Sequence, residues 1–98
     1  MITDLAGSVL VTADGETISA GKPVRIFNIH IISSGGGAAV VSLKNSGAAG
    51  TIYIKETGTV STGKTFDYGL QGQLFPLGCY VDIDANTTSV LLSARKEP

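Results

Sequence analysis

The stretch Val24–Ser33, VRIFNIHIIS, decides the fold because it is the longest run of β-branched and aromatic residues in the chain. Six of its ten residues are Val, Ile or Phe, side chains that favour strands. Lys22-Pro23 precedes the run and Ser34–Gly37 follows it, so turn-forming residues bracket it at both ends. The sequence therefore predicts one long strand over these ten residues.

Both faces of this strand are expected to be largely apolar. Strict alternation places Phe27, Ile29 and Ile31 on one face, and the other face then holds Val24, Ile26, Asn28, His30 and Ile32. A strand that is apolar on both sides is typical of the middle of a sheet with both faces covered. If one face meets the core, the other is free to contact a protein partner. We predict that the contact residues are Val24, Ile26, His30 and Ile32.

Shorter strands are expected on either side of the long one. Asp14-Gly15 predicts a hairpin between residues 8–12 and 16–19, and Ser34–Gly37 predicts another between the long strand and residues 38–45. Further strands are expected at 51–56, on both sides of a bend within 66–76, at 79–85 and at 89–96. About eight short strands and no helix predict an all-β fold. The natural architecture is a compact antiparallel β-sandwich, for which a jelly-roll order is one arrangement.

The composition bounds the domain organisation and the partners. The 98 residues predict a single domain over 1–98, with 1–7 as a flexible N-terminal arm. The chain is 43% hydrophobic and 15% charged, so part of its apolar surface is expected to be hidden in an assembly. A net charge of −1 with scattered basic residues argues against nucleic acid as a partner. Neither a secretory signal nor a bilayer-spanning run is visible, so we expect synthesis in the cytoplasm and no membrane partner.

Single residues with chemical potential have structural explanations. Cys79, the only cysteine, excludes an internal disulfide and a cysteine-based zinc site, and we expect it to be buried in the core. His30, the only histidine, is expected to be packed or hydrogen-bonded, although in a symmetric oligomer it could meet its own copies near an axis. No catalytic constellation, cofactor-binding residue or metal-ligand set emerges, so we do not expect an enzyme.

Two strings resemble ligand-binding loops in part. Asp82, Asp84 and Asn86 have the spacing that opens a calcium loop, but Thr87 and Ser93 occupy the positions where that loop needs Gly and Glu. GTVSTGKT at 58–65 has the letters of a phosphate-binding loop. That loop must enter a helix, whereas FDYGLQGQLFP follows here and is a poor helix former. We therefore expect neither calcium nor nucleotide binding.

Several phrases together resemble a known class of protein. They are KPVRIFNIHIIS, SLKN, GTIYIKETG, LFPLGCYVDIDAN and TSVLLS, which span roughly three-quarters of the chain. In these phrases the chain resembles small structural proteins of tailed bacteriophages, especially those of marine bacteria. The resemblance implies a virion component, such as a capsid decoration or cement protein or a fibre-knob module, and it implies no catalytic, cofactor or metal residue.

These observations predict a non-enzymatic virion structural protein. We expect a capsid decoration or stabilising protein that acts by protein–protein contacts, forms a homo-oligomer with a trimer favoured, and binds capsid or other virion proteins. The alternative is a receptor- or carbohydrate-binding β-sandwich module of a phage fibre or tail. Sugar sites favour exposed aromatic platforms, and the chain offers three Tyr, three Phe and no Trp for one.

Overall fold

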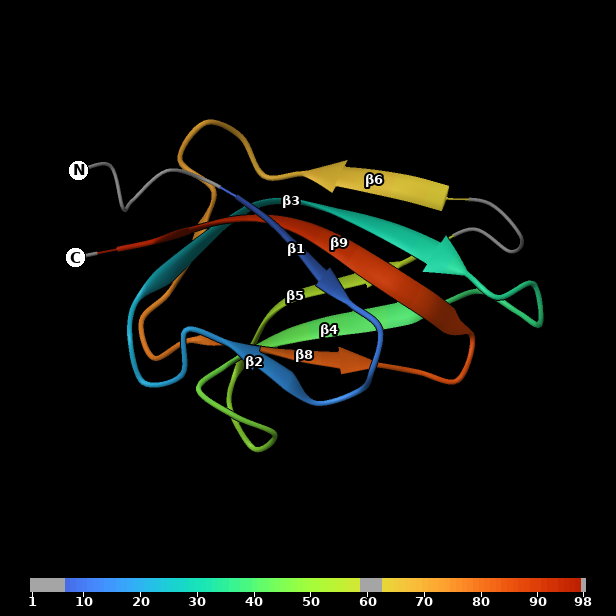
Figure 1. The fold of residues 1–98 in the computed structure, drawn as a ribbon, viewed down its shortest axis with the longest axis horizontal. Coiled ribbons are helices and arrows are strands. Elements are labelled where there is room, and N and C mark those ends of the chain that lie inside the picture. Colours follow the sequence, from blue (N-terminus) through green and yellow to red (C-terminus); the bar gives the residue numbers. More distant parts are fainter. Residues whose placement is uncertain (1–6, 59–62, 98) are drawn as a thin grey trace.

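The computed structural model describes residues 7–58 and 63–97 (Figure 1). These residues contain no helix and form nine strands in two antiparallel sheets that pack face to face, which confirms the predicted all-β sandwich. The strands are β1 (Gly7–Val11), β2 (Glu16–Ile18), β3 (Val24–Ser33), β4 (Val40–Asn45), β5 (Ile52–Thr57), β6 (Gly63–Asp67), β7 (Gln73–Phe75), β8 (Cys79–Ile83) and β9 (Thr87–Lys96). Of the predicted arm 1–7, Gly7 begins β1 and the rest lies outside the described residues.

The strand order identifies the sandwich more closely. The first sheet has the order β1-β9-β3-β6, with β7 also paired to β3, and the second has the order β2-β8-β4-β5. β6 pairs with Asn28–Ile32 and β7 with Val24–Ile26, so the two follow one another along the edge of β3 as a single interrupted strand. Counting them as one leaves eight strands, and every connection except β4–β5 then passes from one sheet to the other. This wrapping is the jelly-roll arrangement.

Two predicted hairpins are therefore wrong. The Asp14-Gly15 turn joins β1 in the first sheet to β2 in the second, where β2 pairs with β8. The Ser34–Gly37 turn likewise leads from β3 to β4 across the core. Gly and Asp allow the chain to reverse, but they do not choose the partner strand, and here burial of both sheets against one another decides. The β4–β5 pair is a true hairpin.

The long strand has the predicted bounds, but its faces exchange at Phe27. Ile26 is opposite Ala94 on β9 and Asn28 is opposite the preceding residue, Ser93, so Phe27 has no partner in the register. An extra residue on one strand is a β-bulge, and it shifts the alternation by one position.

The bulge corrects the predicted contact face. Val24 and Ile26, before the bulge, and Ile29 and Ile31, after it, all point into the core with no exposed surface. Val24 and Ile26 therefore do not share a face with His30 and Ile32, which lie on the outer side of the first sheet. The prediction of one continuous contact face was wrong because the bulge interrupts the alternation on which it relied.

The core between the sheets is built from aliphatic side chains and one ring. Phe75 and Cys79 are fully buried there, as predicted for the cysteine. Burial raises the pKa of the Cys79 thiol to about 12, so the thiolate form is disfavoured near neutral pH. The remaining buried hydrophobic residues are Val11, Val24, Ile26, Ile29, Ile31, Ala39, Val41, Leu43, Ile54, Val81, Ile83, Val90, Leu92 and Ala94.

The two open sides of the sandwich differ. On the β5–β6 side, the Tyr68 hydroxyl donates a hydrogen bond of 3.0 Å to Glu56 Oε2, and the amide of Gly58 donates one of 2.7 Å to the carbonyl of Ala39. Burial, with the hydrogen bond to Glu56, raises the pKa of Tyr68 well above its ordinary value of 10.0. The Tyr68–Glu56 bond links the two sheets on that side, whereas the Gly58–Ala39 bond extends the β4–β5 ladder within the second sheet. On the β1–β2 side a cleft remains open.

Candidate contact surface

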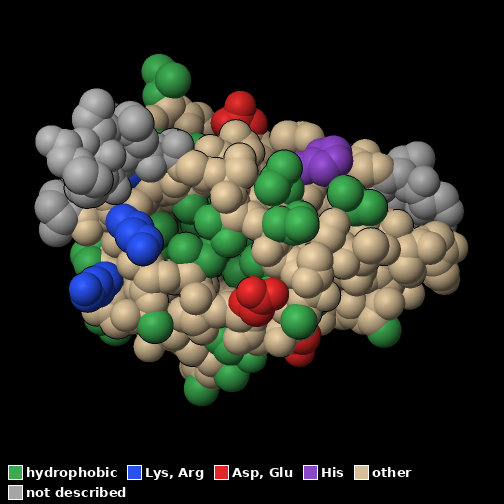
Figure 2. Space-filling model, viewed as in Figure 1, with side chains coloured by type: hydrophobic (Ala, Val, Ile, Leu, Met, Phe, Trp, Pro, Cys, Tyr) green, Lys and Arg blue, Asp and Glu red, His purple; other side chains and the backbone are tan. Residues whose placement is uncertain are grey.

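The outer face of the first sheet carries an exposed apolar patch around the single histidine. Leu10 on β1 is opposite Leu91 on β9, and Leu91 is opposite His30 on β3, so the three side chains form one row across the sheet. Ile32 lies two residues further along β3 on the same face. Leu10 is 57% exposed, and Ile32 and Leu91 are each 39% exposed. We call Leu10, Ile32, Leu91 and His30 the outer patch; Figure 2 shows the histidine bordered by hydrophobic side chains.

His30 is held in place by its neighbours on β6. Its Nδ1 lies 2.7 Å from Thr65 Oγ1, within hydrogen-bond distance. Gly63 lies beside the ring, where a Cβ would come within 2.5 Å of Nε2. The imidazole therefore packs across a strand position that has room only for glycine. A fixed ring next to aliphatic side chains gives this surface a defined shape.

The surroundings of the outer patch are polar and, apart from Asp67, uncharged. The same face carries hydroxyl and amide side chains from the neighbouring positions of the four strands, and the nearest carboxylate in register is Asp67 at the end of β6. A partner can cover such a surface without burying an unpaired charge, which would be costly. The polar neighbours are Ser8, Asn28, Thr65, Ser89 and Ser93.

Part of the outer patch was visible in the sequence and part was missed. His30 and Ile32 were predicted as contact residues, and the structure brings them together on the outer face. Leu10 and Leu91 were not predicted as contact residues. The sequence held a signal for Leu91, because it alternates with the buried Val90 and Leu92 and so must point to the outer face of its strand.

The acidic residues that have the spacing of a calcium loop are used within the fold. Asp82 forms an ion pair of 2.9 Å with Lys44. Asp84 accepts hydrogen bonds from the Val40 amide and, at the turn before β9, from the Asn86 amide and the Thr87 hydroxyl. Among residues 7–58 and 63–97, no group of three or more His, Cys, Asp and Glu side chains is arranged to hold a metal ion.

The string GTVSTGKT leads into a strand. Residues 59–62 lie outside the described part of the chain, but Lys64 and Thr65 belong to β6. A phosphate-binding loop depends on the amides of a helix N-terminus, and the chain after Gly63 is extended instead. The geometry that would support nucleotide binding is not formed by the described residues of this string.

The aromatic side chains do not form a platform for sugars. The Tyr68 hydroxyl is engaged by Glu56, and Phe27 lies under the Arg95 guanidinium, 5.4 Å from the ring centroid. Tyr53 is 40% exposed, but its ring packs against Phe75 at 5.3 Å between centroids. Tyr68, Phe27 and Tyr53 are thus each engaged by a neighbour in the chain, which argues against their use as a sugar platform.

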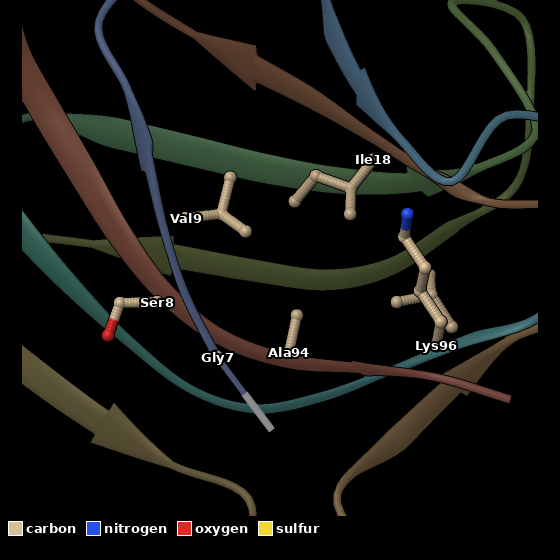
Figure 3. A pocket seen from close by; sticks show the side chains of 7 residues that line it. Gly7, Ser8, Val9, Ile18, Ala94 and Lys96 are labelled. Atoms are coloured by element: carbon tan, nitrogen blue, oxygen red, sulfur yellow. The ribbon is translucent and has the colours of Figure 1, made fainter. Parts of the chain in front are cut away.

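A second surface feature is the cleft between β1 and β2, with a volume of about 240 Å³ (Figure 3). Val9 and Ile18 face one another across it, and the Lys96 side chain reaches toward its rim. Val24 and Ala94 also line it. Sequence reasoning missed this cleft because it paired β1 with β2 in a hairpin. With the two strands in different sheets, the gap between them stays open.

Comparison with protein-family models gives no match, and comparisons with curated proteins and with solved structures give none either. Within the described ranges, no helix is long and apolar enough to cross a bilayer.

Proposed function

We propose that the protein is a non-enzymatic structural component of a bacteriophage virion, a capsid decoration or stabilising protein that binds neighbouring virion proteins through the outer patch. The observation that carries the proposal is the largely uncharged outer face around His30, where three aliphatic side chains are exposed close together. The resemblance of the chain to small phage structural proteins supports the same role. Neither argument requires a reaction or a cofactor.

The outer patch suits a contact that is repeated many times over a shell. Burying a fully exposed Leu or Ile stabilises a complex by about 1.5–3 kcal/mol, and these side chains are already partly covered in the free chain. After the entropic cost of association, one patch supports only weak binding. Several patches joined in one homo-oligomer bind with much higher avidity when their spacing matches the shell. The proposal therefore includes a homo-oligomer, with a trimer favoured.

Cosedimentation with purified capsids of the parent phage that lack this protein tests the proposal. The wild-type chain is expected to bind and to saturate at a fixed number of copies per capsid. Ile32→Lys places a charge within the outer patch and should weaken binding at least tenfold, because a partner would have to bury that ammonium group. Absence of wild-type binding would refute the proposal.

A matched variant separates the outer patch from general surface apolarity. Ile52 on β5 belongs to the second sheet and is 48% exposed, so Ile52→Lys makes the same change at a similar exposure. This variant should bind capsids as the wild-type chain does. Equal loss in the two variants would show that binding does not depend on the face around His30.

A further inference from the structure

Leu70 is the most exposed large hydrophobic side chain of the described residues, with 100% of its surface accessible. It occupies the tip of the turn that interrupts the edge strand between β6 and β7, where the chain leaves β3 and returns. An apolar side chain held fully in water loses the benefit of burial unless another molecule covers it. Single exposed apolar residues are common on protein surfaces, so a contact at Leu70 needs a surface that fits it.

The turn that carries Leu70 is held in one shape. Gly69 donates its amide to Asp67 Oδ1 at 2.9 Å, and Arg25 donates a hydrogen bond of 3.1 Å to the carbonyl of Gln71. Gly69 and Gly72 have φ angles of 82° and 65°, which glycine adopts without strain. A leucine on a constrained turn can enter a partner with a small loss of conformational entropy.

The cleft between β1 and β2 has the size and lining to receive such a side chain. Its volume is about 240 Å³, whereas an apolar cavity of about 150 Å³ already accepts benzene. Val9, Ile18, Val24 and Ala94 supply an apolar lining. In Figure 2, hydrophobic side chains line a hollow beside basic ones, in keeping with this cleft. Leu70 of the same chain is not among the residues that line it.

We propose that Leu70 of one copy docks into the β1–β2 cleft of a second copy of this chain. Each surface holds one charged side chain outside any ion pair of the described residues, and the two are of opposite sign. Lys96 at the cleft rim makes no ion pair with a described carboxylate, while the exposed Asp67 at the base of the turn uses one oxygen for Gly69. Arg25 and Arg95, beside the turn, are both bound by Glu97, at 2.7 Å and 3.0 Å. The carboxylate of Asp67 is therefore available to form an ion pair with Lys96 of the next copy.

The two halves of this contact are different surfaces, so the interface is head to tail. Each copy presents one Leu70 turn and one cleft, and a head-to-tail contact closes into a ring where the rotation between copies allows it. A three-membered ring would be the trimer expected for the virion protein. The inference shares with the proposed function only the association of copies. It is tested on the purified chain alone, so failure to bind capsids and failure of this contact are distinguishable.

Two variants remove one half of the contact each. Leu70→Asp changes a side chain that is fully exposed in its own chain. Gly7→Leu fills the cleft from within, because Gly7 is opposite Ala94, lines the cleft and would have no atom within 4 Å of an added Cβ. Light scattering behind a sizing column should give a multiple of the chain mass for the wild type and the single-chain mass for each variant. Leu77→Asp, at a leucine 49% exposed in another turn, is the control and should leave the mass unchanged.

Mixing the two variants gives the decisive result. Leu70→Asp copies keep an open cleft and Gly7→Leu copies keep the leucine turn, so an equimolar mixture should form one-to-one heterodimers, while neither variant associates alone. A monomeric wild type, a mixture that stays monomeric, or a Leu70→Asp variant that keeps the wild-type mass would each overturn the proposal. Loss of association in Gly7→Leu alone would show that another segment occupies the cleft.

Discussion

The bulge at Phe27 makes a quantitative prediction about three isoleucines of β3. Ile26 and Ile31 are fully buried, whereas Ile32 is 39% exposed on the outer face. Unbroken alternation would place Ile26 and Ile32 together and Ile31 opposite them. We therefore expect Ile26→Ala and Ile31→Ala to lower the free energy of unfolding by similar large amounts and Ile32→Ala to lower it by much less.

The expected sizes follow from burial. Replacing Ile by Ala removes three carbon groups, and at about 0.8 kcal/mol for each buried group the transfer term is about 2.4 kcal/mol. The cavity that remains in a packed core adds to it, so Ile26→Ala and Ile31→Ala should each cost about 3–4 kcal/mol. At Ile32 the solvent fills the vacated space and the side chain was only partly covered, so the cost should be about 1 kcal/mol.

Urea denaturation of the three variants, followed by an optical signal of the folded sandwich, measures these values. The slope of the unfolding free energy with urea should stay unchanged, so that midpoint shifts report stability alone. Since a protein of this size is stable by only about 5–15 kcal/mol, the two large effects should be obvious. A cost at Ile32 equal to that at Ile31, or a small cost at Ile26, would refute the assignment of faces across the bulge.

Two further predictions concern Cys79 and the glycine turns. Burial raises the pKa of Cys79 from 9.0 to about 12, so above pH 9 the native state keeps the thiol proton that the unfolded state loses, and the free energy of unfolding should fall by about 2–3 kcal/mol at pH 11. Urea titrations at pH 9 and pH 11 should show a smaller fall for Cys79→Ala than for the wild type. Tyr68, whose pKa is also raised, contributes in the same direction above pH 10 in both proteins. Gly78→Ala should lower the melting temperature more than Gly21→Ala does. Both positions have positive φ, at 98° and 75°, but only at Gly78 would the new Cβ lie 2.7 Å from a backbone carbonyl oxygen, that of Ser19. Equal melting temperatures for the two variants would contradict this close approach.

Local patterns predicted which residues form strands. The β-branched and aromatic content of Val24–Ser33 and its flanking turns gave β3 its correct bounds. The bend predicted within 66–76 separates β6 from β7, and the loop after residue 45 closes the β4–β5 hairpin. These features depend on residues close together in the chain, so the sequence contains the information directly.

Which strands pair, and which face each residue of β3 occupies, could not be predicted because both depend on residues far away in the sequence. Nothing near Asp14-Gly15 distinguishes a hairpin from a crossing between sheets, since the decision lies in the pairing of β1 with β9 and of β2 with β8. The bulge at Phe27 arises from the register against Ala94 and Ser93 on β9. The outer patch, which joins Leu10, His30 and Leu91 from three strands, became visible only with that register.

The position of β9 between β1 and β3 also constrains how the chain can be made in a cell. Synthesis proceeds from the N-terminus, and all four strands of the second sheet have been translated by Ile83, whereas the first sheet still lacks β9, one of its two inner strands. Until Thr87–Lys96 leaves the ribosome, β1 has no neighbour in its sheet and one edge of β3 is unpaired. Nascent chains that stop early would expose apolar surface to chaperones and proteases, so cellular quality control should pass only chains in which β9 is complete.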